Sequence, residues 1–364
     1  MRLLLILLMT FTGILRAQAA EEILTEELKR PWGMAFVSAH HLLISERAGT
    51  LQLLDIRNGR LRPVKGAPDV VFDGQGGLLD VAVAPDFKPG GWVYFTWSQP
   101  LQERLAATAL GRARLQLNAD PLQLTDWQTL LVTQSAATTR HHYGSRIAFD
   151  RQHVFFSVGD RGERSNGQNL ETHAGSILRL NRDGSVPADN PFVNNPSALP
   201  EIWSYGHRNP QGLAWDNLHK RLWAIEHGPR GGDEINLIEK GENYGWAEVS
   251  WGKEYWNPLY VGEARSKPGM KDPVKMYDPS IAPGSLLLYR GDAIPEWRGN
   301  LLAGALKLQH LNRVSLDGTS AASEQRLLSA LQERLRALAT DQQGRLYIAA
   351  DSGRIYRLSA APDT

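Results

Sequence analysis

The sequence predicts an all-β protein, folded as a six-bladed β-propeller of four-stranded antiparallel blades. Three observations lead to this prediction. A short apolar strand, a polar turn and a second strand recur six times along the chain. The 34 glycines and 20 prolines are spread over the whole length, as many turns require. Helical spacing of apolar residues is confined to residues 21–31 and 320–335, where helices are expected.

The first strand of each repeat carries an apolar core, as in "GMAFV" at 33, "DVAVAPD" at 80 and "RIAFD" at 146. The equivalent residues of the six copies are Met34, Val81, Ile147, Leu213, Leu286 and Leu338. Their intervals of 47, 66, 66, 73 and 52 residues fit propeller blades with inserted loops. A β-sandwich, with about 100 residues, would leave most of the 364 residues unused.

The first twenty residues have the pattern of a secretory signal peptide. A short basic start precedes an apolar stretch from Leu3 to Leu15, and the small residues "AQAA" follow, so we expect cleavage near Ala19 or Ala20. The alternative, a retained membrane anchor, needs a longer apolar stretch. We therefore expect residues 21–364 to form one exported catalytic domain, periplasmic or secreted, without membrane insertion after the signal is removed.

Charge and cysteine content exclude several classes of function. Without Arg2 and Arg16 the chain has 38 basic and 39 acidic side chains, so neither nucleic acid nor an anionic membrane is an expected partner. The absence of cysteine excludes disulfides, Cys-based zinc sites and thiol nucleophiles. The sequence contains no G-x-S-x-G motif, so serine hydrolysis is not supported.

Cations recur near the ends of apolar strands. Arg208 lies in "GHRNPQG", where the Asn-Pro turn restricts the backbone between two strand-like segments. Lys307 follows "AGAL", and Arg334 and Arg336 share one strand face because they are two residues apart. Cations that converge at a propeller mouth would bind a ligand with several anionic groups. Taken singly, an isolated Lys or Arg at a strand end is usually a solvated surface residue.

Two further segments could carry chemistry. In "EHGPRGGDEINLIEKGENYGW", residues 226–246, the glycines let carbonyls turn towards a cation, and Asp233 and Glu234 add hard oxygen ligands. An acidic surface turn is the alternative. His142 precedes one repeated strand and Asp160 follows its partner, so the two could form a base and its orienting carboxylate. By itself "GQGG" at 74–77 indicates a turn.

Together these segments resemble the soluble, pyrroloquinoline quinone (PQQ)-dependent glucose or aldose sugar dehydrogenase family. The resemblance is carried by "GQGGLLD", "HHYGSR", "EIWSYGHRNPQGLAWD", "EHGPRGGDEINLIEKGENYGW", "GALK" and "RLR", in this order from residue 74 to 336. Within this set "GHRNPQG" and "GGDEIN" with "NYGW" are highly specific together, whereas "GALK" and "RLR" count only through their order. The family consists of six-bladed propellers, which agrees with the repeat count.

The resemblance implies oxidation of an aldose at C1 to the lactone, with hydride transfer to PQQ. His142 would be the general base that takes the anomeric proton, held by Asp160, and Arg208 would stabilise charge on the quinone. The residues implied to contact PQQ are Gln75, His142, Arg208, Asn209, Lys307, Arg334 and Arg336. The carbonyls of Gly228 and Pro229 would hold the Ca²⁺ that also binds PQQ, and Glu234 with the Tyr244 carbonyl would form a second, structural Ca²⁺ site.

One position departs from the family pattern. His141 stands where a small polar residue is expected, which leaves sugar preference open and makes His141 a second candidate base. A calcium-dependent propeller lactonase and a non-catalytic carbohydrate-binding propeller are the alternative functions. The expected partners are an aldose substrate and an external electron acceptor, and the protein is expected to be a monomer or homodimer.

Overall fold

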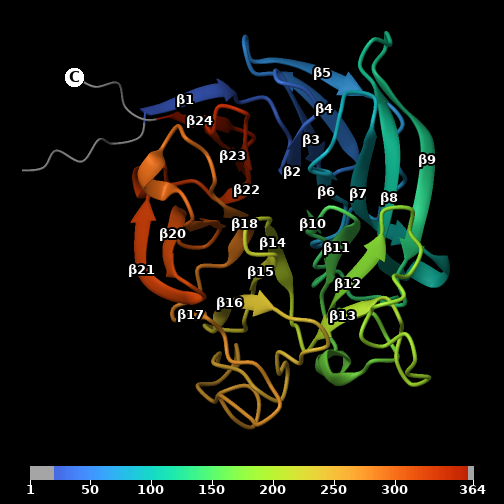
Figure 1. Cartoon of the computed structure of the whole chain (residues 1–364), viewed down its shortest axis with the longest axis vertical. Coiled ribbons are helices and arrows are strands. Elements are labelled where there is room, and N and C mark those ends of the chain that lie inside the picture. Colours follow the sequence, from blue (N-terminus) through green and yellow to red (C-terminus); the bar gives the residue numbers. More distant parts are fainter. Residues whose placement is uncertain (1–19, 360–364) are drawn as a thin grey trace, which may run out of the picture.

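The computed structural model describes residues 20–359, so the predicted signal segment lies outside the described residues except for Ala20. These residues form six four-stranded antiparallel sheets set around a central axis (Figure 1). Strands and turns account for nearly all of this part of the chain, and the prediction of a six-bladed propeller is confirmed.

Each blade runs from an innermost to an outermost strand. In the first three blades the strands are β2 (Pro31–Phe36), β3 (His41–Glu46), β4 (Thr50–Asp55) and β5 (Arg60–Val64); β6 (Leu78–Val83), β7 (Trp92–Pro100), β8 (Ala106–Gln116) and β9 (Gln123–Val132); and β10 (Ile147–Phe149), β11 (His153–Val158), β12 (Ser176–Asn181) and β13 (Ile202–Tyr205).

The remaining blades follow the same order. Their strands are β14 (Pro210–Asp216), β15 (Arg221–Glu226), β16 (Asp233–Ile238) and β17 (Lys275–Tyr277); β18 (Pro283–Leu288), β19 (Leu301–Ala305), β20 (His310–Asp317) and β21 (Ser320–Leu327); and β22 (Leu335–Thr340), β23 (Leu346–Ala350), β24 (Ile355–Ser359) and β1 (Ala20–Thr25). Four short 3₁₀ helices lie in the described connections, at Gln102–Arg104, Arg164–Gln168, Pro295–Trp297 and Ser329–Leu331.

The sixth blade joins the two ends of the described chain. β1 pairs with β24 from Ala20–Ser359 to Thr25–Ile355 and forms the outer edge of a sheet whose other strands are C-terminal. This pairing closes the ring of blades (Figure 1). A residue from each predicted repeat lies in an innermost strand, β2, β6, β10, β14, β18 or β22, so the repeats were assigned to equivalent strands.

Burial explains why the inner strands read as apolar runs. Sheets pack face to face around the ring, so inner strands are covered on both faces. Nearly all of β7, from Val93 to Ser98, is buried, whereas the outer strand β9 alternates between partly buried and exposed residues. Each main cluster of buried side chains therefore joins two neighbouring blades, as Leu43 of the first blade joins Phe95 of the second.

The two helical predictions were wrong. Residues 20–25 form β1 and residues 320–327 form β21, followed by a single 3₁₀ turn. Both strands are the outermost of their blades. Pairing with a neighbouring strand decides the conformation there, because local helical spacing is a weak preference that tertiary context overrides.

Arg146, directly before β10, connects the six blades through hydrogen bonds of its side chain. Its guanidinium is buried and donates one hydrogen bond to each of the other five blades. The acceptors are the Trp32 carbonyl (3.1 Å), Asp80 Oδ1 (2.9 Å), the Gln211 carbonyl (2.9 Å), the Gly284 carbonyl (2.5 Å) and the Arg336 carbonyl (2.9 Å). One side chain thus satisfies buried acceptors from the whole ring.

Within the described residues, no helix has the length and apolar character needed to cross a membrane.

Candidate active site

One face of the propeller collects the predicted site residues. His142 and Arg208 lie in connections that enter the innermost strands β10 and β14, and Asp160 and Gly228 lie in connections that leave β11 and β15. Neighbouring strands are antiparallel, so these two kinds of connection meet at the same end of the sheets. Rigid sheets therefore hold the loops that carry the functional groups.

His142 is held by Asp160. The two atoms His142 Nδ1 and Asp160 Oδ1 are 2.6 Å apart, and Asp160 is 1% exposed. The carboxylate also accepts hydrogen bonds from the Gly162 N–H and from Trp246 Nε1, both at 2.7 Å. These donors fix the orientation of the carboxylate, which in turn fixes the imidazole ring.

The environment keeps His142 neutral. Burial lowers the pKa of His142 to about 4, and the nearby Arg208 charge acts in the same direction, while the hydrogen bond to Asp160 opposes them. A neutral imidazole donates its Nδ1–H to the carboxylate and keeps a lone pair on Nε2. The pair is thus arranged as a base and its orienting partner.

The His142 backbone is itself unusual. Its φ of 55° lies in the left-handed region. This backbone conformation costs a non-glycine residue about 1–3 kcal/mol, and residues that adopt it are found mainly at functional sites. Gln75 Oε1 accepts the His142 N–H at 2.8 Å, and Asn209 Oδ1 accepts the Gly144 N–H at 3.1 Å. Two predicted cofactor residues therefore lie against this loop and hold its backbone.

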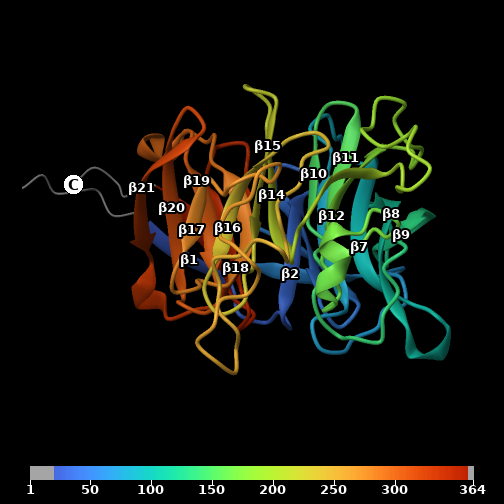
Figure 2. The same cartoon turned by 90° about the horizontal axis from the view of Figure 1, so that it is seen from below.

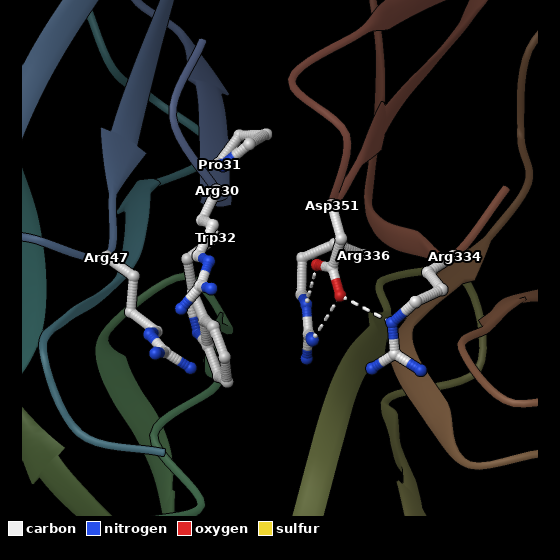
Figure 3. A pocket seen from close by; sticks show the side chains of 7 residues that line it. All are labelled: Arg30, Pro31, Trp32, Arg47, Arg334, Arg336 and Asp351. Atoms are coloured by element: carbon white, nitrogen blue, oxygen red, sulfur yellow. Dashed lines mark hydrogen bonds and ion pairs between the residues drawn. The ribbon is translucent and has the colours of Figure 1, made fainter. Parts of the chain in front are cut away.

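A cavity of about 340 Å³ with four guanidinium groups lies at the same face of the propeller. It is lined by Arg30, Pro31, Trp32, Arg47, Arg334, Arg336 and Asp351. Figure 3 shows Arg30 and Arg47 on one side of the space and the remaining charged groups opposite them. Asp351 accepts from Arg336 Nε at 2.9 Å and Nη2 at 3.0 Å, and from Arg334 Nε at 2.9 Å.

Four arginines and one aspartate give this cavity a formal charge of +3. Burial and the charges of Arg30 and Arg336 lower the pKa of Arg47, because a desolvated cation among cations lacks compensation. The Arg336 guanidinium lies 4.4 Å from the centre of the Trp32 ring, which supplies a flat wall. The cavity is suited to an anionic, planar ligand.

The prediction found Arg334 and Arg336 but missed Arg30, Arg47 and Asp351. The sequence holds a signal for Arg47 and Asp351: an acidic residue recurs at or just after the end of the second strand of four blades, and in two of them an arginine follows it. These residues are Glu46, Asp160, Glu226 and Asp351. Lys307 does not line the cavity, but Arg334 Nη1 donates to the carbonyl of its neighbour Leu306 at 3.1 Å.

Arg208 lies apart from the arginine cavity. It is 8% exposed, and its Nη1 donates to the carbonyls of Gly228 at 2.9 Å and His227 at 3.2 Å. Its guanidinium carbon is 5.3 Å from the centre of the Trp246 ring, the ring that also bonds Asp160. The structure thus brings Arg208, Gly228 and the His142–Asp160 pair together through Trp246.

A small space of about 20 Å³ lies behind Arg208, lined by Glu226, Glu234, Tyr244 and backbone of the glycine-rich turn. Such a volume suits a single water or ion. Burial and the charge of Glu226 raise the pKa of Glu234 to about 8. Asn236 Nδ2 is shared between the two carboxylates at 3.3 Å each, and its Oδ1 has no hydrogen-bond partner in the described part of the chain.

These oxygens fit a hard cation. Glu226 is paired with His207 Nδ1 at 2.8 Å and accepts the Arg208 N–H at 2.7 Å. Glu234, in contrast, accepts only from Asn236 among the described residues, and the amide oxygen of Asn236 is itself unpaired there. No group of three or more His, Cys, Asp or Glu side chains in residues 20–359 is arranged to hold a metal, so a cation here would also need carbonyl ligands. Asp233 is not available, because it accepts from the Gly228 N–H, the Ser280 hydroxyl and the Ala282 N–H.

The backbone of the turn is shaped by its glycines. A Cβ on Gly228 would lie 2.2 Å from the Gly232 carbonyl oxygen, so no larger residue fits. Tyr244 is anchored by its hydroxyl, which donates to the Leu237 carbonyl at 2.6 Å, and its ring stacks on His207 at 4.7 Å. Both anchors hold the main chain near the small space.

Comparison with known proteins finds relatives that match nearly the whole described chain. The family model described as glucose/sorbosone dehydrogenase matches residues 28–357. The aldose sugar dehydrogenase YliI of Escherichia coli is 37% identical over 344 residues, covering 93% of this chain and 92% of that protein. The crystal structure of the soluble E. coli aldose sugar dehydrogenase in its apo-form has a TM-score of 0.89 at 35% identity, covering 95% and 100% of the two chains.

A further solved structure contains a cofactor. The PQQ-bound aldose sugar dehydrogenase of Streptomyces coelicolor is similar to this chain with a TM-score of 0.79 at 29% identity, covering 94% and 99% of the two chains. The family match extends over nearly the whole described chain and includes every predicted site residue. The chain belongs to the glucose/sorbosone dehydrogenase family.

Proposed function

We propose that this protein is a PQQ- and calcium-dependent aldose sugar dehydrogenase that oxidises the sugar at C1 to the lactone. The observation that carries the proposal is the buried pair of His142 and Asp160, on the face of the propeller that also holds a cavity with four arginines. The family and the PQQ-bound relative support the choice of cofactor.

The residues present fit both groups. PQQ has three carboxylates, and the arginine cavity has a formal charge of +3 and a tryptophan wall. Arg334 and Arg336, now paired with Asp351, would bind these carboxylates, and Lys307 would lie next to them. Gln75 and Asn209, which hold the backbone of the His142 loop, would also contact PQQ. The carbonyls of Gly228 and Pro229 would hold the Ca²⁺ next to the cofactor, and Glu234 with the Tyr244 carbonyl a second Ca²⁺.

When bound, PQQ would supply the acceptor for the two electrons and the hydrogen that leave C1, and Ca²⁺ the Lewis acid that polarises this acceptor. His142 Nε2 would accept the proton of the anomeric hydroxyl as the C1–H bond breaks and the C1–O bond gains double-bond character. Asp160 would stabilise the imidazolium formed in this step. The sugar loses one proton and one hydride, which together amount to two electrons and two protons, and leaves as the lactone.

Arg208 would act through charge. Its guanidinium is buried, fixed by two carbonyls and placed next to the Trp246 ring, so it needs no reorganisation during the reaction. A preorganised cation lowers the energy of negative charge that develops beside it, and the effect is greatest where water is excluded.

Export belongs to this proposal as well, since residues 1–20 have the signal pattern and residues 21–364 would be the mature domain. The lactonase alternative required acidic and amide ligands in the channel, but the channel carboxylate Asp80 is paired with Arg146 at 2.9 Å. The binding-module alternative leaves the His142–Asp160 pair without a role.

Reconstitution tests the function. We expect the purified apoprotein to reduce an artificial dye with an aldose only when both PQQ and Ca²⁺ are added. Omission of either one, and addition of NAD in place of PQQ, are the controls. Activity with NAD alone, or none with any aldose, would refute the assignment.

A further inference from the structure

Arg161 is a buried cation that follows Asp160 directly in the sequence. It is 1% exposed and one of the largest fully buried side chains. Burial lowers the pKa of Arg161, and the nearby Tyr143 and Asp160 oppose this effect only in part. A buried cation persists only where acceptors surround it, so its contacts show which part of the chain it holds.

The Arg161 guanidinium donates hydrogen bonds to four main-chain carbonyls. The shortest joins Nη1 to the His141 carbonyl at 2.5 Å. The other acceptors are the carbonyls of Thr139 (3.1 Å from Nη2), Ala106 (3.3 Å from Nη2) and Ser135 (3.3 Å from Nε). In return, the Thr139 hydroxyl donates to the Arg161 carbonyl at 2.5 Å. Arg161 therefore connects the segment before His142 to the turn after β11.

The peptide unit between His141 and His142 is fixed at both of its polar ends. Its carbonyl accepts from Arg161, and its N–H donates to Gln75 Oε1 at 2.8 Å. Residues 139–145 lie outside every strand, so side chains rather than a strand partner hold this peptide unit. His142 has a φ of 55°, and rotation of the peptide unit would change this angle and move the imidazole ring.

Arg161 also contacts the residue on the other side of His142. Its guanidinium carbon lies 3.6 Å from the centre of the Tyr143 ring. Asp160, the neighbour of Arg161, bonds His142 Nδ1 at 2.6 Å. Two adjacent residues, Asp160 and Arg161, thus hold the ring of His142 and the main chain that carries it.

We propose that Arg161 is a positioning residue for the base: it fixes the peptide unit before His142 and so keeps the imidazole ring in contact with Asp160 and directed at the sugar. This inference rests on the proposed function, in which His142 is the base. A displacement of about 1 Å costs a catalytic group about 10²-fold in rate, so a buried side chain that sets its position also sets turnover.

Arg179 in the same blade is the matched control for a purely structural buried arginine. It is 6% exposed, its guanidinium carbon lies 4.7 Å from the centre of the Trp203 ring, and its Nη2 donates to the His153 ring at 3.1 Å. His153 begins β11, whereas Asp160 follows the end of this strand. In Figure 2 the β14–β15 turn projects from the upper face of the propeller, the face at which β11 also begins, so Arg179 lies away from the candidate base.

The first test measures kcat, KM and PQQ affinity on the protein reconstituted with PQQ and Ca²⁺. We expect Arg161→Met to lower kcat by about tenfold to hundredfold. KM and PQQ affinity should stay close to those of the wild type, because Arg161 does not line the arginine cavity. Arg161→Lys should recover part of the loss, since an ammonium group can still donate to the His141 carbonyl. Arg179→Met should change at most the melting temperature.

The apoprotein gives a second measurement that does not depend on turnover. NMR of ring-labelled histidine, with the His142 signal assigned by its absence in His142→Ala, follows the pKa of His142 and its hydrogen bond to Asp160. Burial is the largest influence on this pKa, so a displaced ring should titrate above about 4, closer to its ordinary value of about 6.5, and its Nδ1 proton signal should move upfield. Asp160, Arg208 and His141, the other groups that act on this pKa, all remain in Arg161→Met.

Thr139→Val separates position from charge. It removes only the hydroxyl that bonds the Arg161 carbonyl, so we expect the same changes at His142 in smaller size, also if Arg161→Met does not fold. If the wild-type protein oxidises no aldose, the proposed function fails, but the NMR measurement still tests whether Arg161 positions His142. An unchanged His142 pKa and Nδ1 signal in both variants, or the same changes in Arg179→Met, would overturn the inference.

Discussion

Replacement of Arg146 by methionine tests how the propeller supports its site. The change removes a buried guanidinium that donates one hydrogen bond to each of the other five blades. It leaves Asp80 without its cation and four carbonyl groups without this donor. Removing one partner of a buried ion pair costs about 3–5 kcal/mol. A domain of this size loses about 2 °C of melting temperature per kcal/mol, so we expect a decrease of about 6–10 °C.

The assay is thermal unfolding measured by calorimetry, and urea unfolding serves as a second measurement. Arg57→Met is the control, because Arg57 pairs with Asp55 at the surface and its side chain is 59% exposed, so we expect the melting temperature to stay near that of the wild type. The double variant with Asp80→Asn should recover part of the loss, since it removes the uncompensated charge. A decrease of less than about 2 °C for Arg146→Met would refute the reasoning.

The loss of folding stability caused by Arg146→Met should also depend on pH. Burial raises the pKa of Asp80 even with Arg146 present, and loss of the cation would raise it further. A carboxyl group whose pKa is higher in the folded than in the unfolded state favours folding at low pH, and this contribution is lost as the pH rises through the folded pKa. The Arg146→Met variant should therefore lose less stability relative to the wild type at pH 5 than at pH 8.

Three further predictions concern the ligands. Arg336→Ala should weaken PQQ binding by about tenfold or more, the range for one charge-assisted hydrogen bond, with activity partly recovered at excess PQQ; unchanged affinity in a PQQ titration would contradict its role. Thorough chelation, with metal loss confirmed, should lower the melting temperature, because a ligand bound only to the folded state stabilises it; an unchanged melting temperature would count against the site at Glu234. The kcat/KM should fall only as the pH decreases well below 6.5, since burial lowers the pKa of His142 to about 4 and the protonated ring cannot act as a base; an acid limb at or above pH 6.5 in the pH–rate profile would exclude this state of His142.

The sequence predicted the architecture because each repeat carries a local signal. Met34, Ile147 and Leu213 all begin apolar runs, and each lies in an innermost strand that must be covered by its neighbours. The outermost strands were not predicted in the same way. β1 and β21 are partly exposed and lack a long apolar run, so the pairing partner, which is distant in sequence for β1, determines their conformation.

The candidate site was predicted where a motif is contiguous and missed where it is assembled from distant segments. The pair of His142 and Asp160 follows from the neighbouring strands β10 and β11 of one blade. Arg47 and Asp351 come together only because the first and last blades meet when the ring closes, which no local pattern indicates. Arg146 was missed for the same reason, since its five acceptors are spread over the other five blades.

The most direct test of the central claim is to measure PQQ binding and turnover separately in His142→Ala. The arginine cavity does not include His142, so the variant should retain PQQ, seen as cofactor absorbance that stays with the protein. Turnover should fall by about 10²–10⁴-fold, because the base is lost. His141→Ala is the matched control: its ring lies 4.7 Å from that of His142, and we expect it to alter sugar preference while turnover of the preferred aldose persists. If His141→Ala abolishes turnover and His142→Ala does not, His142 is not the base and the account is wrong.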